Sequence, residues 1–96
     1  MPDVRAFDAT KYRDDPRAIA KYLNDALSSG DPFLIRKAIG DMARAQGATR
    51  FSKKAGMNRE DLYRGFKGKM SPAFDTVVKV LIALDIRLVA KPSAGL

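Results

Sequence analysis

The stretch from Thr49 to Lys67 constrains the fold of this chain more than any other part. Apolar pairs at helical spacing stand on either side of a central glycine, Phe51 with Ala55 and Leu62 with Phe66. Residues one helical turn apart share a face, so each pair can be buried against the other. Gly56 suits a chain that leaves a helix through the left-handed region, where a Cβ is costly. The stretch therefore predicts two short helices joined by a tight turn, which is a helix-turn-helix.

The second of these helices has a clear start and a polar outer face. Asn58 is a favoured N-cap residue, and Asp61 follows in the first turn, where a negative charge is favourable. The side chains left on the outer face are placed as those of a recognition helix, which reach base edges in a major groove. We therefore predict DNA base contacts from Asn58, Arg59, Glu60, Tyr63 and Arg64.

Positive charge is concentrated on the same stretch. The 96 residues have a net charge of +7, but residues 1–43 carry seven basic and seven acidic side chains. Residues 44–69 carry eight basic and two acidic side chains, so nearly all the excess lies there. DNA is the expected partner, because each neutralised phosphate releases counterions. The residues predicted to contact phosphates are Thr49, Arg50, Lys53, Lys54, Lys67 and Lys69.

Each of these residues also has a plainer interpretation. A basic face can be solvated surface that keeps a protein soluble, and any single lysine is equally well explained in that way. Arg59 and Arg64 can pair with Glu60 or Asp61 along their own helix. Tyr63 can cover the shoulder of the helix instead of touching DNA. The coincidence of the charge with the turn motif favours DNA binding.

The composition argues against catalysis. The chain has no cysteine and no histidine, so it lacks a disulfide framework, a thiolate nucleophile and the commonest general base and metal ligand. Its adjacent carboxylate pairs, Asp14-Asp15 and Glu60-Asp61, lie at expected helix starts. No apolar run approaches the length of a membrane span, and no secretory signal follows Met1. We expect no enzyme activity, no metal or cofactor, and a cytoplasmic location.

Start and stop signals divide the rest of the chain into helices. Helix starts are predicted at Asp15-Pro16, Asp31-Pro32, Thr49, Asn58 and Ser71-Pro72. The first two helices are expected to stop at Gly30 and at Gln46-Gly47. Apolar residues at helical spacing predict the core faces: Ile19, Tyr22, Leu23, Ala26 and Leu27; Phe33, Ile35, Ala38, Ile39, Met42 and Ala43; Phe51, Leu62 and Phe66; and Phe74, Val77, Val78, Leu81, Ile82 and Leu84.

The end of the chain predicts a short strand. Asp85 stands where glycine usually terminates a helix, and Asp tolerates the left-handed conformation better than most residues. Residues 86–90 then alternate as a strand, which needs a partner. The candidates are the arm near Val4 and Phe7 or the same strand of a second copy. In a second copy the contacts would come from Ile86, Leu88 and Ala90.

Several segments of the chain resemble the probable addiction-module antidote proteins, which have a phage-repressor-like helix-turn-helix of the XRE/HigA type. The resemblance runs from about Phe7 to Leu88. Its segments are Phe7-Asp8, Tyr22-Leu23-Asn24, Gly30-Asp31-Pro32, residues 39–45 (IGDMARA), residues 56–63 (GMNREDLY) and residues 74–81 (FDTVVKVL). Two positions depart from the expected pattern: Ser52 replaces the alanine usual in helix-turn-helix motifs, and Asp85 replaces the family's glycine.

The resemblance implies a bacterial or phage-derived antitoxin. Such a protein would neutralise a RelE/HigB-type ribonuclease toxin encoded beside it, and would bind its own promoter as a homodimer. The implied fold is an all-α, five-helix, phage-repressor-like domain with a short C-terminal strand. It divides into an arm over residues 1–14, the helix-turn-helix domain over residues 15–91, with its motif at about 49–67, and a tail over residues 92–96.

Two other functions fit the same sequence. One is a solitary transcriptional repressor that has no toxin partner. The other is a protein-interaction module whose basic face plays no part in DNA binding. A toxin-like reading frame beside the gene would favour the antitoxin over the first alternative. Sequence-specific binding to duplex DNA would exclude the second.

Overall fold

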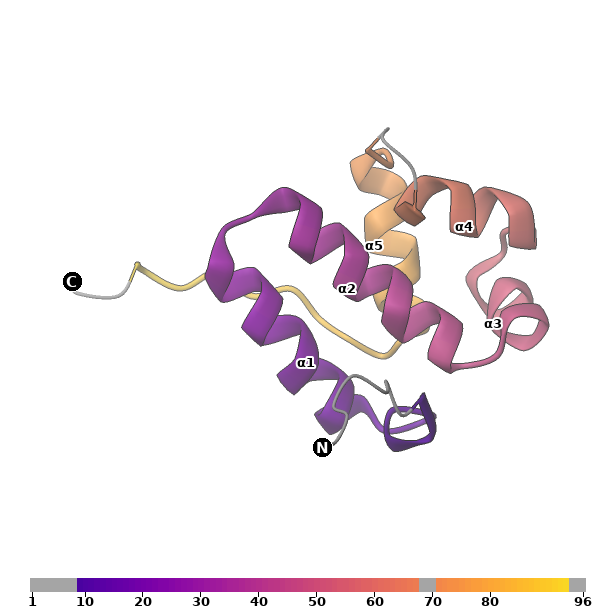
Figure 1. Ribbon diagram of the computed structural model, residues 1–96, viewed down its shortest axis with the longest axis horizontal. Coiled ribbons are helices and arrows are strands. Elements are labelled where there is room, and N and C mark those ends of the chain that lie inside the picture. The colour runs from indigo at the N-terminus through magenta and orange to yellow at the C-terminus, as the bar shows by residue number, and fades with distance from the viewer. Residues whose placement is uncertain (1–8, 68–70, 94–96) are drawn as a thin grey trace, which may run out of the picture.

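The computed structural model describes residues 9–67 and 71–93, and this part of the chain is helical with no strand (Figure 1). A short 3-10 helix, η1 (Ala9–Lys11), precedes the α-helices. These are α1 (Pro16–Ser29), α2 (Pro32–Ala45), α3 (Ala48–Ala55), α4 (Arg59–Lys67) and α5 (Phe74–Ala83). The expectation of an all-α chain with five α-helices is therefore confirmed for the described residues.

The proline-led starts of α1 and α2 are confirmed. Asp15 Oδ1 accepts a hydrogen bond from the backbone N–H of Ala18 at 3.2 Å, which satisfies a donor in the first turn of α1. Asp31 does the same for α2, where its Oδ1 accepts from Phe33 N at 2.9 Å. Gly30 ends α1 in the left-handed region with a φ of 70°.

The start predicted for α3 at Thr49 is wrong. The helix already begins at Ala48, and no side chain caps it. Gly47, with a φ of 94°, turns the chain before Thr49 is reached, and its carbonyl accepts the first helical hydrogen bond, from Phe51 N at 2.9 Å. The glycine therefore begins the helix through its backbone conformation.

The start predicted for α5 at Ser71-Pro72 is also wrong. The helix begins at Phe74, and the preceding Ala73 offers no side-chain cap. Ser71 has a different partner, because its hydroxyl oxygen accepts a hydrogen bond from Arg36 Nη1 of α2 at 3.1 Å. A contact between distant segments thus replaces the local cap.

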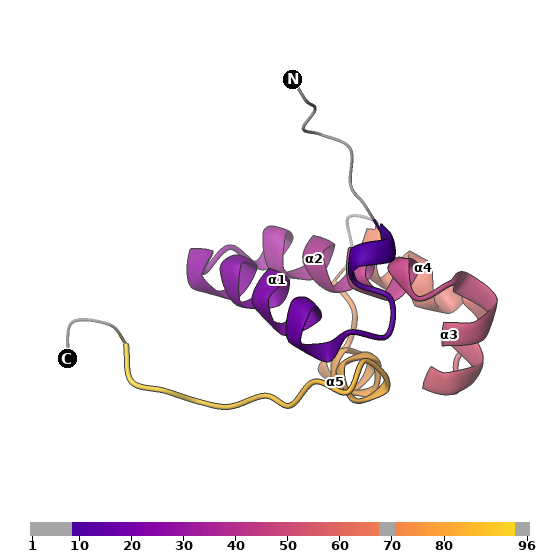
Figure 2. The same ribbon diagram turned by 90° about the horizontal axis from the view of Figure 1, so that it is seen from below.

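The core is built around α2. This helix contacts α1, α3, α4, α5 and η1. Figures 1 and 2 show α1 lying alongside α2, with α3 and α4 toward the far end of the molecule. The largest fully buried side chains come from each of the five α-helices: Ile19, Met42, Phe51, Leu62 and Val80. Burial of these apolar side chains is the main force that fixes α3 and α4 on the body.

A glycine allows α2 and α4 to approach closely. A Cβ placed on Gly40 of α2 would lie 3.0 Å from the Cβ of Phe66 on α4. That separation is shorter than ordinary van der Waals contact, so a larger residue at position 40 would push α4 outward. Gly40 therefore helps to set the position of α4.

The buried face predicted for α5 is partly wrong. Phe74 and Ile82 were predicted to be in the core, but their exposed fractions are 69% and 66%. Residues 74, 78 and 82 follow one another at single-turn intervals and form a second stripe beside the buried one. The core takes the other stripe: Val80, Leu81, Ala83 and Leu84.

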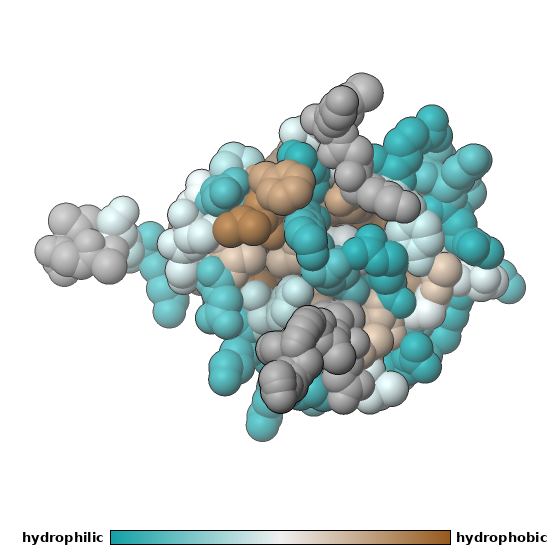
Figure 3. Space-filling view, viewed as in Figure 1, coloured by the Kyte–Doolittle hydropathy of each residue, from teal (hydrophilic) through white to brown (hydrophobic). Residues whose placement is uncertain are grey.

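Two residues of the predicted core faces of α1 and α2 are also exposed. Leu27, near the end of α1, and Phe33, at the start of α2, both leave much of their surface in solvent. They lie at the corner where α1 ends and α2 begins. Exposed Leu34 adjoins this corner. Figure 3 shows apolar side chains gathered over the start of α2.

The strand expected at Ile86–Ala90 is absent from the structure. Residues 86–93 follow α5 as an irregular segment that extends past α1 (Figure 2). A strand requires a hydrogen-bonded neighbour, and no described residue pairs with this segment. Val4 and Phe7, the expected partners within the chain, lie outside the described residues. Ile86 packs against the core, whereas Leu88 and Ala90 are exposed.

Candidate nucleic-acid interface

The predicted turn between α3 and α4 forms a regular helix C-terminus. Gly56 has a φ of 72°, in the left-handed region. Its N–H donates to Lys53 O at 3.2 Å, and Met57 N donates to Ser52 O at 3.0 Å. This pair of bonds is a Schellman motif, which satisfies the last carbonyls of α3. Gly56 can therefore turn the chain out of α3 while the last carbonyl groups of that helix stay hydrogen-bonded.

Asn58 and Asp61 fix the start of α4 through reciprocal hydrogen bonds. Asn58 Oδ1 accepts from Asp61 N at 2.8 Å, and Asn58 Nδ2 donates to Asp61 Oδ2 at 3.1 Å. The arrangement resembles a capping box, in which cap and third residue support each other. The predicted cap is thus confirmed, and Asn58 is held close to the outer face of α4.

The inner faces of α3 and α4 are buried as the sequence predicts. Phe51 and Ala55 of α3 and Leu62 and Phe66 of α4 all belong to the core. Ser52 is also buried, and its hydroxyl donates to Thr49 O at 3.0 Å. Serine therefore fits where alanine is usual, because its hydroxyl is satisfied within its own helix.

The residues predicted to contact bases lie on the outer face of α4. Asn58, Arg59, Glu60 and Arg64 are exposed. Arg64 Nη2 pairs with Asp61 Oδ1 at 2.6 Å, as the plainer interpretation anticipates for this arginine. The guanidinium of Arg59 has no ion pair within the described ranges, so it is the freer of the two arginines.

Tyr63 lies where the plainer interpretation puts it, over the shoulder of α4. The ring is half-buried against the core, and the guanidinium carbon of Arg44 lies 6.0 Å from its centroid. Such a cation–π contact orients the ring. Tyr63 therefore covers the shoulder of α4 while remaining partly accessible beside the outer face.

The residues predicted to contact phosphates divide into three groups. Thr49 and Lys53 are exposed on α3. Arg50 pairs with Asp14, and Lys54 Nζ lies 3.7 Å from Asp85 Oδ2. Lys67 ends α4, but its side chain and the whole of Lys69 lie outside the described part of the structure. The members of the set whose side chains the structure describes therefore all lie on α3.

The matching family is the one whose description reads "Probable addiction module antidote protein", and its sequence model covers residues 3–92. This chain belongs to that family. It is also 34% identical to an uncharacterized protein of Haemophilus influenzae over 90 residues, which are 94% of this chain and 93% of the relative. No solved structure matches the chain.

Membership of the antidote family has two direct consequences. The family is not an enzyme family. An antidote acts against a toxin, so membership implies a cognate toxin as partner.

Within the described ranges, no group of acidic side chains could hold a metal ion. None of the described helices has the length and apolar character needed to cross a membrane.

A buried carboxylate that was not among the predicted site residues lies beside the site. Asp41 of α2 accepts a hydrogen bond from the hydroxyl of Tyr22 at 3.0 Å, pairs with Lys37 at 3.2 Å and also pairs with Arg44. Burial, followed by the hydrogen bond to Asp41, raises the pKa of Tyr22 to about 12. The spacing of Lys37, Asp41 and Arg44 along one helix is a signal that could have revealed this cluster.

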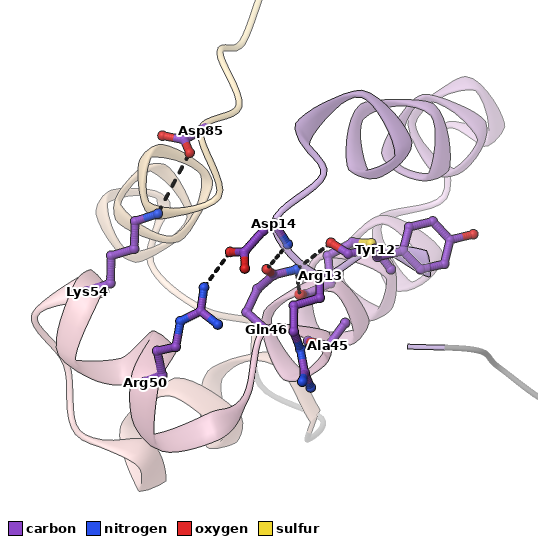
Figure 4. A network of polar contacts seen from close by, with 9 residues as sticks. Tyr12, Arg13, Asp14, Ala45, Gln46, Arg50, Lys54 and Asp85 are labelled. Carbon is purple, nitrogen blue, oxygen red and sulfur yellow. Dashed lines mark hydrogen bonds and ion pairs between the residues drawn. The ribbon is translucent and has the colours of Figure 1, made fainter. Parts of the chain in front are cut away.

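A second missed feature joins the N-terminal segment to the end of α2. The buried side chain of Gln46 donates from Nε2 to Tyr12 O at 2.9 Å and to Met42 O at 3.1 Å. Its Oε1 accepts from Asp14 N at 2.9 Å, and Arg13 Nε donates to Ala45 O at 3.1 Å (Figure 4). Residues 12–14 are therefore fixed beside α3, and no sequence signal marks this contact.

Proposed function

We propose that this antidote protein is the antitoxin of a type II toxin–antitoxin module. It represses its own promoter by binding operator DNA through α3 and α4, and it neutralises a RelE/HigB-type ribonuclease toxin. The observation that carries the DNA-binding part is the outward position of Arg59 and Arg64 next to the basic surface of α3. A guanidinium can bond the edge of guanine through two hydrogen bonds.

The two helices of the motif have different tasks in this proposal. Here α4 enters the major groove and reads bases, while α3 faces the phosphates with Thr49, Arg50, Lys53 and Lys54. Phosphate contacts position a protein on DNA, and base contacts give specificity. Two protomers of a homodimer would place their α4 helices in successive major grooves of a pseudo-palindromic operator.

The proposed dimer uses the exposed stripe of α5 and the segment after it. An open groove of about 380 Å³ lies between them, lined by Val78, Leu81, Ile82, Asp85, Ile86, Arg87 and Leu88. Ile82, Leu88 and Val89 leave large apolar surfaces in solvent here. Such surfaces favour association. The strand expected at residues 86–90 would then form only by pairing with its copy in the second protomer.

The toxin is proposed to dock on the half of the chain that contains α1 and α2. Residues 1–43 carry equal numbers of basic and acidic side chains, in contrast to the basic α3 and α4. Leu27, Phe33 and Leu34 form an exposed apolar corner on this half. A surface of this kind can meet a basic toxin without competing for the DNA-facing helices.

Replacing Arg59 tests the DNA-binding part of the proposal. We expect Arg59→Ala to weaken operator binding by about 1–3 kcal/mol and to relax the preference for one base pair, because a bidentate contact is lost. Arg17→Ala is the matched control, since Arg17 is an exposed arginine on α1. Titration of both variants against operator and unrelated duplexes measures the effect. If Arg59→Ala matched wild type on the operator, α4 would not be the reader.

Replacing Phe33 tests the toxin surface. We expect Phe33→Ser to prevent co-purification with the protein encoded beside this gene, because an apolar contact at the α1–α2 corner is lost. Phe74→Ser is the control, since Phe74 is even more exposed but lies on α5. Operator binding by Phe33→Ser should stay at the wild-type level. Equal co-purification of both variants would place the toxin elsewhere.

A further inference from the structure

Two of the cations that face the proposed DNA surface already have acidic partners. Arg50 pairs with Asp14, and Lys54 pairs with Asp85 at 3.7 Å (Figure 4). Lys53, on the same helix, has no ion pair among the described residues. Both carboxylates come from outside the helix-turn-helix, one from the segment before α1 and the other from the end of α5. Parts of the chain far apart in sequence therefore reach the same helix.

Asp14 and Asp85 share an unusual backbone conformation. They are the described residues other than glycine with a positive φ, 56° for Asp14 and 64° for Asp85. Asp85 is held there by the hydrogen bond from its N–H to Ile82 O at 2.9 Å. Asp14 is held by the bond from its N–H to Gln46 Oε1 at 2.9 Å. Both carboxylates therefore stand on backbone that is hydrogen-bonded in place, and both reach α3 through their ion pairs.

The two ion pairs remain open to exchange with an incoming anion. The side chains of Arg50, Asp14, Lys54 and Asp85 have exposed fractions of 56%, 59%, 52% and 67%. Ion pairs with this much exposure are weak, since water screens both charges. A DNA phosphate could therefore replace either carboxylate without unfolding any element.

We propose that Asp14 and Asp85 compete with the DNA backbone for Arg50 and Lys54, and so limit the affinity of α3 for any duplex. A cation already neutralised within the protein contributes less to counterion release when DNA binds. The competition acts on phosphate contacts, so it lowers binding to operator and unrelated DNA by the same factor. This inference rests on the proposed DNA-binding function.

Neutral isosteres test the competition. Asn has the shape of Asp and tolerates a positive φ at least as well, so Asp14→Asn and Asp85→Asn remove charge and keep the backbone. We expect each variant to bind operator and unrelated duplexes about two- to fivefold more tightly than wild type. The effects should multiply in the double variant, because the two carboxylates act on different cations. Thermal unfolding of each variant verifies the fold.

A matched control separates this effect from overall charge. Asp25→Asn makes the same change in charge at an exposed residue of α1. We expect this variant to bind DNA about as tightly as wild type, because salt screens charges that are far from the DNA. In an Arg50→Gln protein, Asp14→Asn should change the affinity no more than Asp25→Asn does.

The possible outcomes are distinct. Equal tightening by all three Asp→Asn variants would assign the effect to net charge and overturn the competition. Weaker binding of Asp14→Asn or Asp85→Asn would show that the carboxylates position the cations for DNA, which also overturns it. Failure of wild type to bind any duplex would remove both the inference and the proposed DNA-binding function. Wild-type binding with unchanged variants would remove the inference alone.

Discussion

Asp41 is the residue at which the charges of α2 converge. Its carboxylate has three partners, Tyr22, Lys37 and Arg44, and it has little contact with solvent. A buried carboxylate is costly unless such partners satisfy it. Arg44 also lies over the ring of Tyr63. The carboxylate of Asp41 is thus bonded to Tyr22 of α1, and through Arg44 it is connected to Tyr63 of α4.

The hydroxyl of Tyr22 makes the stability of the folded protein depend on pH in alkaline solution. The pKa of this hydroxyl in the folded protein is about 12, whereas in the unfolded chain it lies near the ordinary tyrosine value of 10.0. The folded state therefore keeps a proton that the unfolded state loses, and stability falls as the pH rises from about 10 to about 12. Below about pH 10 the contribution is fully present. Tyr22→Phe removes the ionising group, so we expect its free energy of unfolding to fall less over this range.

Chemical unfolding of wild type and Tyr22→Phe at several alkaline pH values measures the effect. All other side chains are the same in the two proteins, so the difference between the two curves isolates Tyr22. A difference that stays constant between about pH 9 and about pH 12 would contradict the raised pKa.

At the residue scale, the sequence correctly predicts which side chains are buried where a helix has a single stripe of apolar residues. On α2, Ala38, Ile39 and Met42 are all in the core. On α5 the apolar residues form two adjacent stripes, and hydropathy cannot tell which stripe faces the protein. Packing of α3 and α2 on one side decides it, so Phe74 and Ile82 remain exposed.

At the scale of the elements, local chemistry predicts the turn of the motif correctly. Gly56 adopts the left-handed conformation, and Asn58 caps α4. Both depend on residues within one helical turn, which the sequence displays directly. The starts of α3 and α5 could not be predicted in the same way. The conformation of Gly47 and the contact of Ser71 with distant Arg36 decide where these helices begin.

The contact between α2 and α4 yields a prediction about two glycines. Gly40→Ala gains about 1 kcal/mol of helix propensity but sets a Cβ 3.0 Å from Phe66 Cβ, and overpacking costs about 1–3 kcal/mol. Phe66 Cβ is fixed to the backbone of α4, so the whole helix must shift. We expect a net loss of about 1 kcal/mol in the free energy of unfolding, with weaker operator binding.

Gly65→Ala is the matched comparison. A Cβ at position 65 meets Pro72 Cβ at 3.3 Å, and Pro72 lies in a connecting segment, so a shift of a few tenths of an ångström there displaces no helix. We expect Gly65→Ala to stabilise the protein by up to about 1 kcal/mol. Urea unfolding of both variants measures the two effects. Equal stabilisation by both would show that α4 is not held close to α2.

For the whole molecule, the proposed dimer makes a testable prediction at the exposed stripe of α5. We expect Ile82→Asp to be monomeric at concentrations where wild type is a dimer, because a charge would be buried in the interface. Leu34→Asp is the control, since Leu34 is an exposed leucine on α2. Sedimentation equilibrium measures the change in mass. Operator affinity should fall with the dimer, while binding to one half-site should persist.

A dimeric Ile82→Asp protein would assign self-association to another surface. A monomeric wild type would remove the dimer from the proposal altogether. The strand pairing of residues 86–90 can be followed in the same experiment through amide hydrogen exchange, which should slow only in the dimer.

Contacts between distant segments were the part of the site that the sequence could not predict. Arg50 and Lys54 were correctly placed on α3, but nothing in their surroundings indicates Asp14 or Asp85 as partners. No local sequence pattern around Gln46 predicts its hydrogen bonds to the segment before α1 either. These contacts depend on how the helices pack, and packing is fixed only when the whole chain has folded.

The bonds of Gln46 to Tyr12 and Asp14 limit how far the amino end can be shortened. Removing residues 1–8 should leave the amide of Gln46 fully engaged. A cut that also removes residues 9–14 would leave the buried Oε1 of Gln46 without the donor it has in Asp14, between α2 and α3. Any loss of toxin or DNA binding after the longer cut would then report damage to the scaffold, so only the shorter cut can reveal what the first residues recognise.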